Sequence, residues 1–172
     1  MINRAVEILL VEDNSDNVDL MLRAFRNAQV LNKISVVRNG LEALDFLFSA
    51  GRFAQRAPNH GSLLVLLDLI LPRLHGLDVL RAIKSEVSTR QIPVIILSNS
   101  AEEKDIMQCY RIGAEHFLIK PFRCEEFLEA ISRLGMDWRL ANCSQSLIRP
   151  QQSHPLPQSL GGAGKVVRCE ES

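Results

Sequence analysis

The sequence lacks several features that would direct it to a membrane or to nucleic acid. No apolar run approaches the roughly 20 residues that a membrane-spanning helix needs, and no signal-peptide pattern opens the chain. The 20 Lys and Arg residues are balanced by 20 Asp and Glu residues, so no excess charge attracts polyanions. We therefore expect a cytoplasmic protein with no nucleic-acid partner and no membrane partner.

The cysteines and histidines also lack the spacing of a metal site. No Cys-x-x-Cys pair is present, and no two histidines stand at helical spacing. Widely separated cysteines in a cytosolic chain are typically reduced thiols. The sequence therefore supports neither a disulfide framework nor a zinc site on its four cysteines, Cys109, Cys124, Cys143 and Cys169.

Short apolar runs alternate with segments of helical periodicity. Most of the runs are continuously apolar, as expected for strands that are covered on both faces. They span residues 6–11, 34–37, 63–67, 94–97 and 117–119. Strands that alternate with helices indicate βαβ units with right-handed crossovers. We predict an α/β fold over residues 5–135, a (βα)5 doubly wound parallel sheet.

Capping residues mark the ends of several predicted helices. Asn39 with Glu42 predicts the start of a helix over 41–48, and Ser100 with Glu103 predicts a capping box for a helix over 102–112. Gly135 is expected to end the last helix, because glycine is the usual residue just after a helix terminus.

Two segments are expected to lie outside the regular elements. Residues 50–62 contain two glycines and a proline, and they predict a long polar loop before the third strand. Residues 136–172 are rich in Pro, Ser, Gln and Gly, and they cannot bury enough apolar area to order themselves. We predict that this segment is a flexible C-terminal extension.

Charged and polar side chains stand at the carboxyl ends of four predicted strands: Glu12, Asp13, Asp68, Ser98 and Lys120. Taken singly, each could be a turn residue, a helix start or a solvated loop residue. In a parallel sheet, however, these strand ends meet at one edge, where ligands bind. Their joint placement therefore predicts one functional site.

The residue types suit chemistry on a phosphoryl group. An aspartate such as Asp68 can attack phosphorus and form an acyl phosphate. Mg²⁺ takes one or two carboxylates together with substrate oxygens, and Glu12, Asp13 and Asp68 can supply them. Lys120 and the Ser98 hydroxyl can neutralise or hydrogen-bond phosphoryl oxygens. Crowded carboxylates repel one another, so we expect at least one raised pKa.

Three other classes compete with this interpretation. A haloacid-dehalogenase-like phosphatase needs a second acid two residues after the nucleophile, and that position is Ile70. A dinucleotide-binding fold needs a glycine-rich loop after the first strand, and residues 12–15 contain no glycine. A phosphorylation-independent interaction module remains the alternative, although such a protein would normally have lost one of the charged residues.

The motifs around these residues resemble the receiver domain of two-component response regulators. The matching pieces are residues 8–14, 67–72 with Gly76, 93–98 and 120–121. The resemblance implies strand order 2-1-3-4-5 and a phosphoryl group that Asp68 receives from a histidine kinase, with catalysis limited to the protein's own phosphorylation and dephosphorylation. It also implies a residue-by-residue set of roles: Mg²⁺ held by Glu12, Asp13, Asp68 and the Ile70 carbonyl, Lys120 paired with the phosphate, Ser98 and Phe117 as switch residues, and a cis peptide bond before Pro121.

A narrower similarity concerns the small regulators that are paired with bacterial phytochromes. It rests on residues 40–47, the loop around Pro58 and the segment 92–94. It implies a phytochrome-type kinase as partner, no DNA-binding output domain, and a homodimer formed through the fourth helix, fifth strand and fifth helix.

Overall fold

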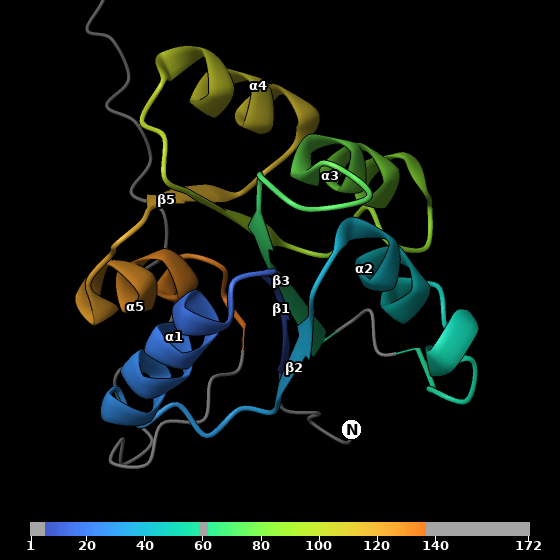
Figure 1. Ribbon diagram of the computed structural model, residues 1–172, viewed down its shortest axis with the longest axis horizontal. Helices are drawn as coiled ribbons and strands as arrows, with labels where there is room; N and C mark the ends of the chain where they lie inside the picture. Colours follow the sequence, from blue (N-terminus) through green and yellow to red (C-terminus); the bar gives the residue numbers. More distant parts are fainter. Residues whose placement is uncertain (1–5, 59–61, 137–172) are drawn as a thin grey trace, which may run out of the picture.

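The computed structural model describes residues 6–58 and 62–136 of the chain. Five strands alternate with five helices along this part of the sequence (Figure 1). The strands are β1 (Glu7–Val11), β2 (Ile34–Val37), β3 (Leu63–Asp68), β4 (Val94–Ser98) and β5 (His116–Ile119). The helices are α1 (Ser15–Asn27), α2 (Gly40–Leu47), α3 (Gly76–Ser85), α4 (Glu103–Ile112) and α5 (Cys124–Ser132), with a 3₁₀ turn η1 (Gly51–Phe53) after α2.

The five strands form one parallel sheet in the order β2-β1-β3-β4-β5. Ile8 of β1 pairs with Ile34 on one side and with Leu64 on the other. This order confirms the predicted doubly wound fold. Because the strands all run in one direction, their carboxyl ends share one edge of the sheet. Among the described residues, no helix is both long and apolar enough to cross a bilayer.

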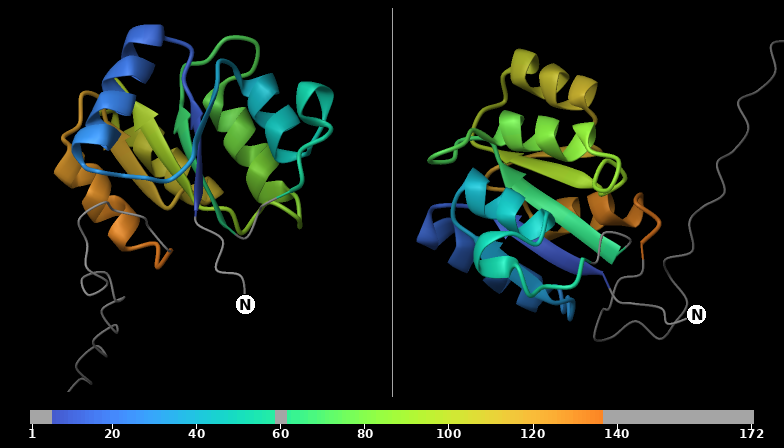
Figure 2. Two further views of the ribbon diagram at one scale, coloured as in Figure 1. Left: turned by 90° about the horizontal axis from the view of Figure 1, so that it is seen from below. Right: turned by 90° about the vertical axis from the view of Figure 1, so that its right-hand side faces the viewer.

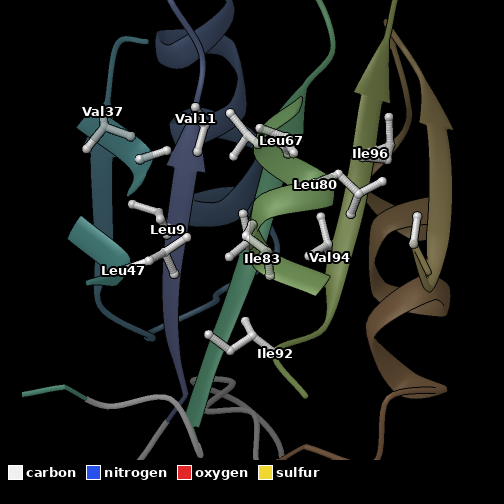
Figure 3. Packing of buried hydrophobic residues seen from close by; sticks show 14 of the residues in the cluster. Leu9, Val11, Val37, Leu47, Leu67, Leu80, Ile83, Ile92, Val94 and Ile96 are labelled. Atoms are coloured by element: carbon white, nitrogen blue, oxygen red, sulfur yellow. The ribbon is translucent and has the colours of Figure 1, made fainter. Parts of the chain in front are cut away.

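Alternate strand residues fill two separate cores on the two faces of the sheet. On one face, Leu9 and Val11 pack with residues of α2, α3 and α4, and Figure 3 shows several of these side chains interdigitating with Leu80 and Ile83. On the other face, α1 and α5 cover the sheet side by side (Figures 1 and 2). Burial on both faces explains why the strands are continuously apolar.

An aromatic pair joins the two helices of the second face. The rings of Phe25 in α1 and Phe127 in α5 lie 4.7 Å apart between centroids, in a tilted arrangement. Both side chains are almost completely buried. Such pairs stabilise packing beyond the area that they bury, so this contact holds α1 and α5 together.

Of two helix starts predicted from capping residues, the structure confirms one and contradicts the other. Asn39 accepts a hydrogen bond from the Glu42 amide at 2.9 Å and donates one to the Glu42 side chain at 3.0 Å, as predicted. The predicted capping box at Ser100 is wrong. The Ser100 hydroxyl accepts from the Glu102 amide at 3.2 Å instead, and α4 begins only at Glu103. Ser100 therefore shapes the preceding loop.

The last helix ends earlier than predicted. α5 stops at Ser132, because the Leu134 amide donates to the carbonyl of Ile131, three residues back, and this tightens the final turn. Gly135 follows with a positive φ of 61°. Of the predicted extension, 136–172, all but Met136 lies outside the described residues.

The described part of the segment 50–62, residues 50–58 and 62, is more regular than a polar loop. It contains η1, and the ring of Phe53 packs edge-on against that of Phe46 in α2, with 5.1 Å between centroids. The prediction rested on the two glycines and the proline of this segment, whereas contacts of Phe53 and Arg56 anchor its described part.

An ionic cluster around the buried Glu7 attaches Arg56 of this segment to the amino end of β1. The carboxylate of Glu7 lies 2.8 Å from Arg56, 3.0 Å from Lys33 and 2.8 Å from the Ser35 hydroxyl. The Arg56 guanidinium also lies over the Phe46 ring, 3.9 Å from its centroid. Burial alone would raise the pKa of Glu7, but the hydrogen bonds from Arg56, Lys33 and Ser35 outweigh it and lower the pKa.

Replacing Glu7 tests the contribution of this cluster to stability. Glu7→Gln leaves the half-buried Arg56 without its carboxylate, and we expect a loss of about 3 kcal/mol in unfolding free energy at pH 7. Because the folded-state pKa of Glu7 is lowered, its contribution is fully present above the unfolded value of about 4.3 and is lost as pH falls through the lower folded value. Urea unfolding at several pH values should show the two proteins converging in acid.

The matched control is Asp78→Asn, which removes an exposed ion pair with Arg81. Exposed pairs contribute at most about 1 kcal/mol, so this variant should unfold nearly as the wild type does. A Glu7→Gln protein of wild-type stability at pH 7 would contradict the role assigned to the cluster.

Candidate functional site

Three carboxylates meet at the carboxyl edge of the sheet. Glu12 directly follows β1, Asp68 is the last residue of β3, and β1 and β3 are neighbours. One oxygen from each of Glu12, Asp13 and Asp68 lies within 4.8 Å of the others. Glu12 and Asp68 are buried, whereas Asp13 is exposed. The acids that the sequence placed at separate strand ends therefore form one cluster.

The ammonium of Lys120 links two of these carboxylates. Its Nζ donates to Asp68 Oδ2 at 2.6 Å and to Glu12 Oε2 at 2.8 Å. Lys120 follows β5, which is separated from β3 by β4, so the long lysine side chain reaches across the sheet edge. The Lys120 side chain is only 8% exposed, so this pairing is largely shielded from water.

The loop after β3 shapes the surroundings of Asp68. The Ile70 amide donates to Asp68 Oδ1 at 3.1 Å, while the Ile70 side chain is exposed. A Cβ atom on Gly76 would clash with the backbone carbonyl of Asp68, so only glycine allows the loop to return this close to the strand end. Both oxygens of Asp68 therefore have a defined donor.

Of the remaining predicted residues, Ser98 and Pro121 border the same edge, whereas Phe117 lies two residues before the end of β5. Ser98 is the last residue of β4, and its buried hydroxyl accepts a hydrogen bond from the Ser100 amide at 3.1 Å. Phe117 in β5 is half-buried and packs against the core under α2, α3 and α4. The Lys120–Pro121 peptide bond is cis.

The pKa values of three ionisable groups at the site are shifted from their ordinary values. Burial raises the pKa of Asp68, and the hydrogen bonds from Lys120 and the Ile70 amide offset this only in part. Burial also acts to raise the pKa of Glu12, but the hydrogen bonds from Lys120 and Asn17 prevail and lower it. For Lys120, burial acts to lower the pKa, yet its bonds to the two carboxylates raise it. A raised carboxyl pKa was expected, although burial contributes more to it than repulsion does.

One contact of the site was missed by sequence reasoning. Asn17 in α1 donates from its side-chain amide to Glu12 Oε1 at 3.0 Å, and the Asn14 amide donates to the same oxygen at 3.2 Å. The available signal was the position of Asn17, five residues after Glu12 and within the first turn of a helix that starts beside the strand end.

The donor set fits a hard divalent cation. Mg²⁺ prefers oxygen ligands and is commonly held by one or two carboxylates together with waters. Glu12 and Asp68 share a single ammonium, and Asp13 adds a third, exposed carboxylate, so net negative charge remains at the cluster. These residues could therefore hold such an ion and then bind the oxygens of a phosphoryl group.

The fold and the site together define the class of protein to which this chain belongs. A parallel sheet of order 2-1-3-4-5 with two layers of helices, and with acids and a lysine clustered at its carboxyl edge, is the flavodoxin-like receiver architecture. Comparison with known families agrees, because the model of the response regulator receiver domain matches residues 8–132. The chain belongs to this family.

Individual members of the family are similar to this chain over most of its length. The chain is similar to the probable methanogenesis regulatory protein FilR2 of Methanothrix harundinacea, with 34% identity over 76% of this chain and 82% of that protein. It is also similar to the solved bacteriophytochrome response regulator AtBRR, with 40% identity, a TM-score of 0.71, and coverage of 81% of this chain and 99% of that one.

A third relative was solved with a metal ion. The Mn²⁺-bound form of response regulator Rcp1 is 28% identical, with a TM-score of 0.63 over 73% of this chain and 88% of that one. Solved relatives therefore include a small phytochrome-associated regulator and a divalent-metal complex.

Removing the exposed acid tests whether the cluster holds a cation. Asp13→Ala should weaken Mg²⁺ binding by about tenfold or more, because even groups outside the first coordination shell contribute that much at metal sites. Calorimetric titration of the unphosphorylated protein measures this directly. Asp16→Ala, which removes a carboxylate from the first turn of α1, is the control and should bind as the wild type does. Unchanged affinity in Asp13→Ala would make the acid cluster purely structural.

Proposed function

We propose that this protein is a phosphorelay response regulator in which Asp68 accepts a phosphoryl group from the phosphohistidine of a histidine kinase. The observation that carries the proposal is the pairing of a buried strand-end aspartate with a buried lysine, 2.6 Å apart, beside two further acids. In this step an Asp68 carboxylate oxygen attacks phosphorus, the phosphorus–nitrogen bond breaks, and the histidine ring keeps the bonding electrons. An acyl phosphate is formed.

The chain's own residues position the incoming group. The Asp68 carboxylate is oriented by Lys120 and by the Ile70 amide before the reaction. As the phosphoryl group arrives, Lys120 neutralises one of its oxygens, and the Ser98 hydroxyl donates to another. Phosphoryl transfer depends mainly on such positioning and charge neutralisation, so no further acid or base is required.

Mg²⁺ is the cofactor that we assign to the cluster. Glu12, Asp13, Asp68 and the Ile70 carbonyl would hold it. When bound, it supplies positive charge to the oxygens of the transferring group. The oxygen-rich donor set, with fewer buried cations than acids, supports this assignment.

Ser98 and Phe117 are the residues that we assign to signal output. Movement of Ser98 towards the phosphoryl group frees space beside β5, and Phe117, which is only half-buried, can fill it by turning inward. That movement changes the surface formed by α4, β5 and α5. Three large apolar side chains are exposed on α4 and β5, namely Met107, Tyr110 and Ile119.

We infer that this surface forms a homodimer whose strength depends on phosphorylation. Exposed apolar side chains gathered on adjacent elements are typical of interaction surfaces. We further propose a phytochrome-type kinase as the phosphate donor in the cytoplasm, a proposal supported by the 40% identity to a bacteriophytochrome response regulator. Residues 5–135 would form the receiver domain, and residues 136–172 an extension.

Asp68→Asn is the direct test of the acceptor. The wild type, incubated with acetyl phosphate and Mg²⁺, should gain the mass of one phosphoryl group, and the variant should gain none because an amide oxygen is a poor nucleophile. Asp78→Asn, on the exposed face of α3, is the control and should be labelled normally. A labelled Asp68→Asn protein would move the acceptor elsewhere, and an unlabelled wild type would favour an interaction module that works without phosphate.

Phe117→Ala tests the output path. The variant should be phosphorylated at a rate within about twofold of the wild type while its change in association is blunted, because the vacated space is no longer filled by a ring. Light scattering with and without acetyl phosphate measures the association. Phe53→Ala removes another half-buried ring from the same core and is the matched control. A normal response in Phe117→Ala would show that the signal leaves through other residues.

A further inference from the structure

The carboxylate of Glu12 is buried and is held by hydrogen bonds at both of its oxygens. It is 0% exposed, and both of its carboxylate oxygens are engaged. Oε2 accepts from Lys120, whereas Oε1 accepts from the Asn14 amide and from the Asn17 side chain. A carboxylate with donors on both oxygens cannot rotate without breaking a hydrogen bond.

The Asn14 amide alone would not fix the orientation of this carboxylate. It lies two residues from Glu12 and follows the local backbone, whereas Asn17 approaches from α1. Asn17 is itself well placed, because its backbone amide is bound by the Asn14 side chain that caps the helix. A rigid helix therefore delivers the side-chain amide to the strand end.

Asn17 borders a hollow that has both apolar and polar walls. The hollow, of about 190 Å³, lies between α1 and the segment after β5, and it is lined by Leu20, Met21, Ala24, Pro121 and Phe122 together with the polar Asn99 and Lys120. Asparagine is a weaker helix former than leucine or alanine. The hydrogen bond from its side chain to Glu12 Oε1 gives the amide of Asn17 a specific role at this position.

We propose that Asn17 is a positioning residue for phosphoryl transfer, one that fixes the Glu12 carboxylate and, through it, Lys120 and the cation site. The inference rests on the proposed function. Hydrogen bonds run without a break from Asn17 to Glu12, and from Lys120 to both Glu12 and Asp68. Groups that orient metal-binding side chains typically contribute 10–100-fold in affinity.

The Asn17→Leu variant distinguishes a loss of Glu12 positioning from a loss of folding stability. Leucine favours the helix and adds apolar surface to the hollow, so the variant should unfold at the same or a higher urea concentration than the wild type. Its affinity for Mg²⁺, measured by calorimetry on unphosphorylated protein, should nevertheless fall by about tenfold. Labelling by acetyl phosphate should need correspondingly more Mg²⁺, and its rate at saturating Mg²⁺ should return to within about threefold of the wild type.

Two further variants complete the test. Asn32→Ala removes a buried side-chain hydrogen bond to the Val6 carbonyl, far from the site, and should lose stability while binding Mg²⁺ normally. Asn17→Gln keeps the amide donor and should recover part of the affinity. Wild-type Mg²⁺ binding in Asn17→Leu, or equal weakening in Asn32→Ala, would overturn the proposal. Calorimetry needs no phosphorylation, so failure of phosphate uptake in the wild type would count against the proposed function and leave this result intact.

Discussion

The ionic bridge from Glu12 through Lys120 to Asp68 is the interaction on which the site depends. The three side chains are 1%, 8% and 6% exposed, so each has given up most of its hydration. Removing charges from water is costly, and well-packed apolar residues are often at least as stabilising as a buried ion pair. The bridge is therefore better explained by the chemistry of the site than by stability. It holds Asp68, the nucleophile that we propose, in contact with the ammonium of Lys120 before a substrate arrives.

The packing of the two hydrophobic cores sets the relative positions of the residues that form this bridge. Asp68 ends β3 and Lys120 directly follows β5, two strands that are separated by β4. The distance between the two residues is set by sheet register and by helices packed on both faces. Phe25 and Phe127 join α1 to α5, and α5 follows the segment that carries Lys120. Because tightly packed interiors transmit small displacements, loosening either core would shift the charged groups relative to one another.

A buried glutamate lies at each end of β1. The two glutamates differ in the charged side chains that surround them. Glu7, at the amino end, is matched by two cations, Arg56 and Lys33, and it anchors a loop. At the carboxyl end, Glu12 shares Lys120 with Asp68, so acids outnumber the ammonium. Burial also leaves the pKa of Asp68 raised, whereas that of Glu7 is lowered. In the first cluster two cations surround one acid, whereas the second keeps an excess of acids that can bind added positive charge.

The sequence by itself determined the order of elements, the parallel sheet and the strand-end residues, because continuous apolar runs, helical periodicity and the placement of Asp68 and Lys120 are local patterns. The capping role of Asn39 was equally readable. Tertiary structure alone decided that Ser100 does not cap α4, that Phe53 anchors the loop before β3, and that Asn17 reaches Glu12. Each of these contacts depends on how a helix or loop is placed over the sheet, a distance set by packing that spacing along the chain does not encode.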